Sequence, residues 1–128
     1  MQALLLPLGD DLYALELRTV REVLVAPPTT PVPGAPATVV GVFNLHGEVV
    51  PLLDTARLLG VGDAGPAAYA AVADTGAGIA GLTAGGMPES AWLGDTAGRA
   101  RLPGTVARFR TGTRVVTLIA LDELVERL

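Results

Sequence analysis

His46 is the only histidine of the chain, and its chemistry is the most easily imagined as functional. Two carboxylates follow it, Glu48 and Asp54, so that a base and two acids lie within nine positions. A general base needs a nucleophile or a substrate proton within hydrogen-bond reach. On an extended strand Asp54 would lie about 20 Å beyond Glu48, so the three groups are not expected to converge. We therefore expect no catalytic site, and a small ligand-binding or enzymatic β-barrel that uses His46 is the alternative.

Metal, cofactor and phosphate sites are also not expected. Cysteine is absent, so a metal site would have to be built from carboxylates around one histidine, and no calcium-loop spacing is present. The glycine-rich segments 74–81 and 84–88 lack the lysine and the strand-to-helix setting of a phosphate-binding loop. These segments are predicted to be turns.

The charge of the chain argues against nucleic acid and membrane as partners. Net charge is −4, and all nine basic residues are arginines without a polybasic run. Five arginines lie between positions 99 and 114, and Arg108 and Arg110 are expected on one side of a strand. That group is either a patch for an acidic partner or a solvated sheet face. The opening segment is too short and uncharged for a signal peptide, and no apolar run approaches a membrane span of about 20 residues. A soluble cytoplasmic protein is the expectation.

The pattern of apolar runs and turn residues predicts a mainly β, barrel-like domain. Four hairpins are expected, formed by residues 2–8 with 12–17, 41–45 with 48–54, 69–74 with 79–85, and 103–110 with 114–121. His46 and Gly47 form a two-residue loop of the kind that tight hairpins favour. In the strand over 12–17 the odd-numbered side is expected to face the core, and residues 19–24 form either a helical turn or a strand. About eight or nine strands result, in a chain whose length fits one domain.

Several single features carry their own expectations. Asp54 is expected to cap a short helix that Gly60 ends. Pro51 indicates an edge strand or a bulge. The small residues of 69–85 either allow close approach of another sheet or mark a weak edge. Trp92 is expected to be buried at a junction between subdomains. Five prolines in 27–36 predict a crossing loop within the domain, and Leu121, Leu124, Val125 and Leu128 predict the buried face of a C-terminal amphipathic helix.

The motifs LPLGDDLYALELRTVREVL and VPGAPATVVGVFNLHGEVVPLLDTARLLG resemble the CheW-like family of chemotaxis coupling proteins. The most specific part is Gly41 to Asp54, which matches a Gly-Val-x-Asn-Leu-Arg-Gly pattern followed by apolar residues, proline and aspartate. The resemblance is close as far as Gly60. After Tyr69 it rests on the hydrophobic pattern, and the segment between Leu93 and Pro103 is short for the family.

The resemblance implies two SH3-like five-stranded barrels that share a core, within a single domain over residues 1–128. The second barrel would be built mainly from about residues 61–110. It also implies a cytoplasmic, non-catalytic adaptor that joins the cytoplasmic tip of a chemoreceptor to the regulatory domain of the CheA histidine kinase. The receptor's helical hairpin would enter the groove between the barrels, and one barrel end would dock the kinase. By position, the partner contacts are Val20, Glu22, Val23, Gly41, Asn44 and His46.

This chain departs from the family pattern at His46, where relatives usually carry arginine. Arginine is always charged and binds carboxylates through two donors, whereas histidine, with an ordinary pKa of about 6.5, is mostly neutral near pH 7. A charge-assisted contact of about 1.5–3 kcal/mol would then be weakened or lost. The alternative within the family is therefore an adaptor that binds the receptor or the kinase only.

Overall fold

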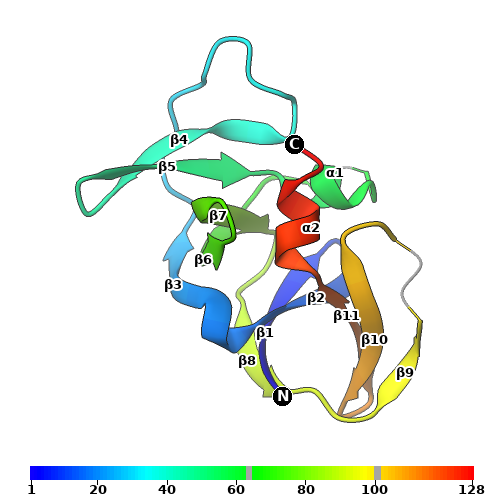
Figure 1. Ribbon diagram of the computed structural model, residues 1–128. Helices are drawn as coiled ribbons and strands as arrows, with labels where there is room; N and C mark the ends of the chain where they lie inside the picture. Colours follow the sequence, from blue (N-terminus) through cyan, green and yellow to red (C-terminus); the bar gives the residue numbers. More distant parts are fainter. Residues whose placement is uncertain (63–64, 100–101) are drawn as a thin grey trace.

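The structure is a computed structural model that describes residues 1–62, 65–99 and 102–128. Within these residues eleven strands form two sheets (Figure 1). The strands are β1 (Gln2–Leu8), β2 (Asp11–Glu16), β3 (Val20–Val25), β4 (Val39–Leu45), β5 (Glu48–Leu53), β6 (Tyr69–Thr75), β7 (Gly78–Ala84), β8 (Glu89–Trp92), β9 (Thr96–Arg99), β10 (Thr105–Thr111) and β11 (Arg114–Ile119). The helices are the 3₁₀ turn η1 (Leu17–Thr19), α1 (Thr55–Leu59) and α2 (Leu121–Val125). The predicted mainly β class is confirmed.

One sheet has six strands in the order β8-β1-β2-β11-β10-β9, and the other has five in the order β3-β6-β7-β5-β4. Five strands were expected in each. The six-stranded sheet has four central strands, and β8 and β9, with four residues each, add short edges on its opposite sides. The four predicted hairpins are confirmed as the antiparallel pairs β1–β2, β4–β5, β6–β7 and β10–β11.

Three apolar clusters hold the sheets together. The six-stranded sheet encloses one cluster, which includes Leu5, Val116 and Leu118, and the five-stranded sheet encloses another, which includes Phe43 and Val72. The largest cluster lies between the sheets and takes side chains from both sheets and both α-helices. The predicted arrangement of two small SH3-like barrels around a shared core is confirmed.

The shared core explains why β2 is buried on two faces, where one buried face was expected. Tyr13 and Leu15 belong to the shared core, while Ala14 points into the cluster of the six-stranded sheet. Burial raises the pKa of Tyr13, and the Asp11 carboxylate adds a smaller effect in the same direction. A strand between two cores reads as an apolar run because neither of its faces meets water.

The five-stranded sheet settles two of the open alternatives. Residues 20–25 form the strand β3. The hairpin β6–β7 is central in the sheet, and Ala71, Ala73, Ala80 and Ala84 belong to the shared core, so its small residues serve close approach. A Cβ at Gly81 would lie 3.0 Å from the Leu52 side chain and 3.1 Å from Phe43. Large residues would therefore not fit here.

Pro51 lies in β5, which has neighbours on both sides, so the expected edge strand is wrong for β5 as a whole. Locally the proline is at an edge, because the parallel pairing of β5 with β7 begins only at Leu52. The opposite strand β4 carries the irregularity, with a shift of register between Val39 and Gly41. A residue without an N–H group is tolerated at such a place.

The short helices fix the ends of the shared core. Asp54 accepts a hydrogen bond from the Arg57 N–H at 3.2 Å, and Gly60 ends α1 with φ of 74°, as predicted. Thr55 is buried and forms two hydrogen bonds with β7: its N–H donates to Thr83 Oγ1 at 3.0 Å, and its hydroxyl donates to the Thr83 carbonyl at 2.8 Å.

Within the described ranges, no helix is both long and apolar enough to cross a membrane.

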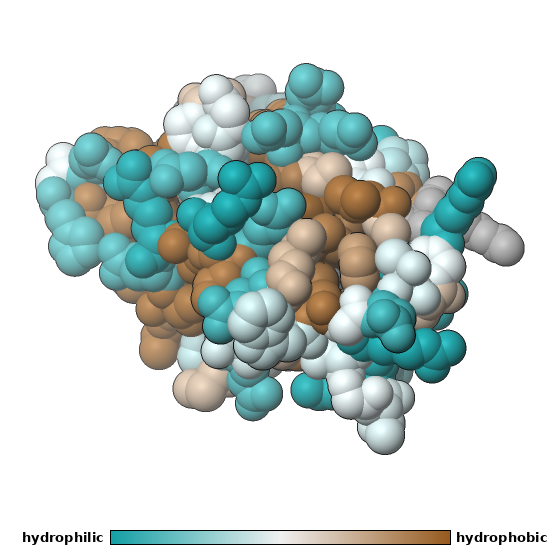
Figure 2. All heavy atoms as spheres, turned by 60° about the horizontal axis from the view of Figure 1, so that its bottom comes forward, coloured by the Kyte–Doolittle hydropathy of each residue, from teal (hydrophilic) through white to brown (hydrophobic). Residues whose placement is uncertain are grey.

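Two expectations about burial are wrong. Leu128 is 49% exposed, because α2 ends at Val125 and only Leu121 and Leu124 of its predicted apolar face are fully buried. Trp92 is 65% exposed, since it lies on the edge strand β8 and not between the sheets. Met1 and Met87 are also exposed. Figure 2 shows apolar side chains around a hollow on the face that lies at the bottom of Figure 1.

Candidate partner-binding surface

The turn between β4 and β5 presents His46 at the tip of a hairpin. His46 has φ of 51° and Gly47 has φ of 90°, so both central residues adopt the left-handed conformation that tight hairpins require. Asn44 stabilises the turn, because its Oδ1 accepts a hydrogen bond from the Gly47 N–H at 3.1 Å. The predicted two-residue turn is confirmed, and its side chains are held outward by the backbone.

His46 contacts a carboxylate that the sequence spacing did not indicate. Its Nε2 lies 3.0 Å from Glu22 Oε1 on β3, which is 24 positions away along the chain. The contact links the hairpin to β3, the opposite edge strand of the same sheet. Both residues are partner positions carried over from the family, but their mutual contact depends on the curl of the sheet.

The surroundings of His46 do not resemble a catalytic or metal centre. Its side chain is 78% exposed, whereas a catalytic base works in an enclosed site beside a nucleophile or substrate. Among the described residues, no group of three or more histidine, cysteine, aspartate or glutamate side chains could hold a metal ion. The arrangement can bind a charged or polar partner group through hydrogen bonds.

Two of the carried-over positions are turned inward. Gly41 is buried, and a Cβ there would lie 2.7 Å from the Thr30 carbonyl oxygen, so the glycine allows the crossing loop to pair with β4. Thr30 and Val42 exchange two backbone hydrogen bonds of 2.8 and 2.9 Å at this place. Val20 is half-buried against the shared core. These two residues shape the surface more than they present side chains on it.

Exposed valines lie on the strands that carry these residues. Val23 is 40% exposed on β3, and Val25 on the same strand and Val49 on the hairpin are 76% and 73% exposed. Val25 and Val49 were not predicted from the sequence, although their alternation with inward-facing neighbours on β3 and β5 is a signal that could have identified them.

Arg21, next to Glu22, pairs with Asp74 of β6 at 3.0 Å, and this hydrogen bond raises the pKa of the guanidinium.

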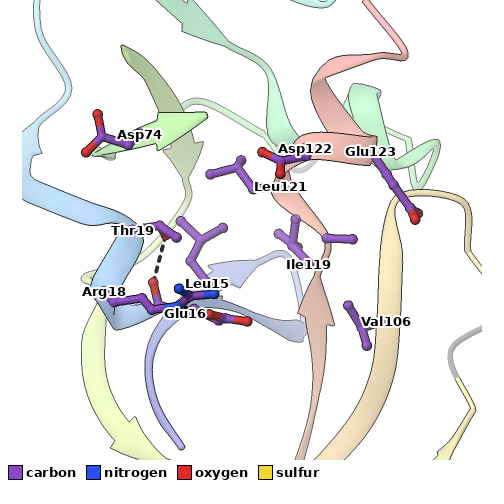
Figure 3. Close-up of a pocket in the computed structure, with 11 residues that line it drawn as sticks. Leu15, Glu16, Arg18, Thr19, Asp74, Val106, Ile119, Leu121, Asp122 and Glu123 are labelled. Atoms are coloured by element: carbon purple, nitrogen blue, oxygen red, sulfur yellow. Dashed lines mark hydrogen bonds and ion pairs between the residues drawn. The ribbon is translucent and has the colours of Figure 1, made fainter. Parts of the chain in front are cut away.

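A groove of about 310 Å³ opens where the two sheets meet (Figure 3). Its floor includes Leu15, Ile119 and Leu121, and its rim carries more acidic than basic side chains. The charged residues of the rim are Glu16, Asp74, Asp122, Glu123 and Arg18. Arg18 pairs with Glu16, which raises the pKa of the arginine, and Asp74 pairs with Arg21, so the negative charge of the rim that has no ion-pair partner among the described residues comes from Asp122 and Glu123.

A second groove, of about 450 Å³, is largely apolar and lies beside the C-terminal helix. Val39, Pro51 and Leu53 form one side of it, while Ile79 and Val125 belong to the others. It adjoins the β4–β5 hairpin through Pro51. Of these two grooves, the first has an acidic rim and the second a largely apolar lining.

Comparison with known proteins gives agreement in both sequence and fold. The family described as "CheW-like domain" matches residues 2–127. "Chemotaxis protein CheW" of Rhizobium meliloti (strain 1021) is 43% identical over 58 residues, which cover 45% of this chain and 37% of the relative. "Protein FrzA" of Myxococcus xanthus is 40% identical over 78 residues, which cover 59% of this chain and 49% of the relative. The matched stretches thus span less than half the length of these relatives.

A solved structure shares the fold at low sequence identity. It is the "scaffolding protein TtCheW from Thermoanaerobacter tengcongensis", with a TM-score of 0.85 and 20% identity over 96% of this chain and 86% of the other. Because the family match covers nearly the whole chain and the fold agrees, the protein belongs to the CheW-like domain family.

Proposed function

We propose that this chain is a non-catalytic scaffold of a chemotaxis-type signalling system. It would couple the cytoplasmic tip of a chemoreceptor to the regulatory domain of the CheA histidine kinase, and it would therefore act in the cytoplasm. The observation that carries the proposal is the match of the CheW-like domain family over residues 2–127. The exposed, unenclosed position of His46 adds support, because it favours recognition over catalysis.

The proposed contact surface consists of β3 and the β4–β5 hairpin, with Val20, Glu22, Val23, Gly41, Asn44 and His46. Val23 supplies exposed apolar area, while Glu22, Asn44 and His46 supply polar groups around it. An apolar patch with a polar rim is typical of protein interfaces. A helical hairpin of the receptor would pack against this surface.

The proposal is tested by co-purification of the protein with a receptor cytoplasmic tip and with CheA. We expect both to be retained. The Val23→Glu variant should lose binding, because a charge would be placed in the apolar part of the contact. Val61→Glu is the matched control, since Val61 is also 40% exposed but follows α1. Retention of neither partner by the unmodified protein would contradict the proposal.

A second candidate is an adaptor that engages only one of the two partners. It is favoured by His46, which stands where relatives usually carry arginine and which already contacts Glu22 at 3.0 Å. His46→Arg should then strengthen binding of the missing partner, because arginine brings a permanent charge and two parallel donors. Unchanged binding of both partners by the variant would remove His46 from this explanation.

A further inference from the structure

The charges of the chain are segregated along the sequence. Residues 96–121 contain five arginines and no acidic residue, whereas the rest of the chain contains thirteen acidic residues and four arginines. The basic segment forms β9, β10 and β11, which lie side by side at one edge of the six-stranded sheet. A net acidic protein therefore carries one basic wall.

The arginines of this wall that the structure describes differ from the others in having no side-chain partner among the described residues. Outside the wall, Arg18, Arg21 and Arg57 form ion pairs with Glu16, Asp74 and Asp54, and Arg127 donates to the Leu58 carbonyl at 2.8 Å. In the wall, the arginines that the structure describes make no ion pair or hydrogen bond through their side chains with any described residue; they are Arg99, Arg108, Arg110 and Arg114. All four are exposed. Their charges are free to meet another molecule.

The basic wall continues directly into the acidic groove between the sheets. Arg108 lies opposite Thr117 and Arg110 opposite Val115, which places the arginines on the outward face of the β10–β11 pair. Ile119 follows Thr117 by two positions on the same face, and both Ile119 and Val106 line the groove. The groove also carries Asp122 and Glu123 of α2, which form no ion pair with a described residue, beside Glu16 and Asp74, which pair with Arg18 and Arg21. The surface thus has a positive end on β9–β11 and a negative end in the groove, whose lining Figure 3 shows.

We propose that this surface binds a second copy of the chain, with the arginine wall of each copy on the acidic groove of the other. A surface with both charges side by side is self-complementary under a two-fold rotation, because residue i then contacts residue j and j contacts i. The occupant is a second copy, since another protein would have to reproduce both the negative and the positive end. The exposed Val106 and Val115 add apolar area at the centre of the contact.

Sedimentation velocity of the purified full chain at low and high ionic strength tests the proposal. At about 0.01 M salt charge attraction extends far from the surface, and at about 0.5 M it is screened. We expect a dimer at low salt that dissociates at high salt. A monomer at both ionic strengths, at all protein concentrations reached, would overturn the proposal.

A charge exchange makes the test specific. Arg108→Glu with Arg110→Glu, and separately Glu16→Arg with Glu123→Arg, should each abolish the dimer. An equimolar mixture of the two variants should restore a hetero-dimer, because both of its contacts then join opposite charges: the reversed wall meets the reversed groove, and the unchanged wall meets the unchanged groove. Glu48→Arg with Glu89→Arg, which changes the same charge outside the surface, should not reduce self-association, and circular dichroism checks that all variants are folded. A dimer that persists in the arginine variant, or a mixture that stays monomeric, would contradict the proposal.

Discussion

The charged side chains on the outer surfaces of the two sheets differ in whether they have partners within the chain. On the five-stranded sheet, Arg21 pairs with Asp74, and His46 lies 3.0 Å from Glu22, so that the charged groups engage each other and leave Val23, Val25 and Val49 exposed. On the six-stranded sheet, the exposed arginines of β9–β11 have no such partners among the described residues. The first surface is suited to recognition by apolar shape, and the second to recognition by charge.

The difference has a consequence for how each contact responds to solution conditions. Burial of valine side chains is insensitive to moderate salt, whereas attraction between exposed charges is screened over about 10 Å at 0.1 M. Binding of a receptor tip at β3 and the β4–β5 hairpin should therefore persist at salt concentrations at which the proposed dimer dissociates. Both sheets contribute side chains to one shared core and so form one unit.

The largest expected effect concerns that unit. We propose that the chain unfolds as a single domain, because the shared core takes side chains from both sheets. Leu82→Ala in that core, where the side chain is completely buried, should destabilise the fold by about 2–5 kcal/mol in urea titrations. Fluorescence of Trp92 on the six-stranded sheet and far-ultraviolet circular dichroism should give one midpoint. Two separate midpoints, with only one shifted, would show that the barrels unfold independently.

A smaller loss of stability is expected at the base of the hairpin surface. Gly41→Ala would place a Cβ within 2.7 Å of the Thr30 carbonyl oxygen, so the crossing loop must move. We expect a loss of about 1–3 kcal/mol, and weaker binding of partners at the hairpin without change in self-association. Val40→Ala, at the neighbouring half-exposed position, is the control and should change stability little. Equal midpoints for Gly41→Ala and the unmodified protein would remove Gly41 as a structural requirement.

The interior offers a matched pair of threonines, one bonded and one not. Thr55→Val removes the hydroxyl that donates to the Thr83 carbonyl at 2.8 Å and should cost about 1–2 kcal/mol in thermal unfolding. Thr38 has a buried hydroxyl oxygen without a hydrogen-bond partner among the described residues, so Thr38→Val should be neutral or stabilising. The reverse order of the two melting temperatures would contradict this part of the structure.

The smallest effect on stability is expected for the contact between His46 and Glu22. His46→Gln removes the charge that histidine can carry, but both partners are solvated, so the free energy of unfolding should change by no more than about 1 kcal/mol. Partner binding should change more than stability does. If the variant instead unfolded readily, the contact of His46 with Glu22 would be required to hold the two edges of the sheet together.

Local signals predicted much of the fold because they act over a few residues. The His46-Gly47 turn, the Asp54 cap and the Gly60 end follow from the backbone conformations that these residues permit. The double burial of β2 and the exposure of Trp92 could not be read in the same way. Each depends on how the two sheets pack against each other, and the residues next to Ala14 and Trp92 in the sequence do not indicate that packing.

The candidate site was predictable only in part for the same reason. The family motif identifies Asn44 and His46 as candidate site residues. The contact of His46 with Glu22 could not be predicted from it, because that contact requires the opposite edges of a curled sheet to approach each other. The spacing of residues along the chain pointed to Glu48 and Asp54 as neighbours of the histidine. The arginine wall was visible as a cluster in the sequence, and its lack of partners became evident only from the packing of the acidic residues elsewhere.

The most direct measurement is the sedimentation of three proteins, each alone and with a receptor-tip fragment, at about 0.01 M and about 0.5 M salt. The proteins are the unmodified chain, Val23→Glu, and Arg108→Glu with Arg110→Glu. We expect Val23→Glu to lose the receptor fragment at both ionic strengths and to keep the salt-sensitive dimer, while the arginine variant does the opposite. The account assigns receptor binding to one surface and self-association to the other. It would be contradicted if both variants lost both interactions, or if the unmodified chain lost receptor binding at high salt.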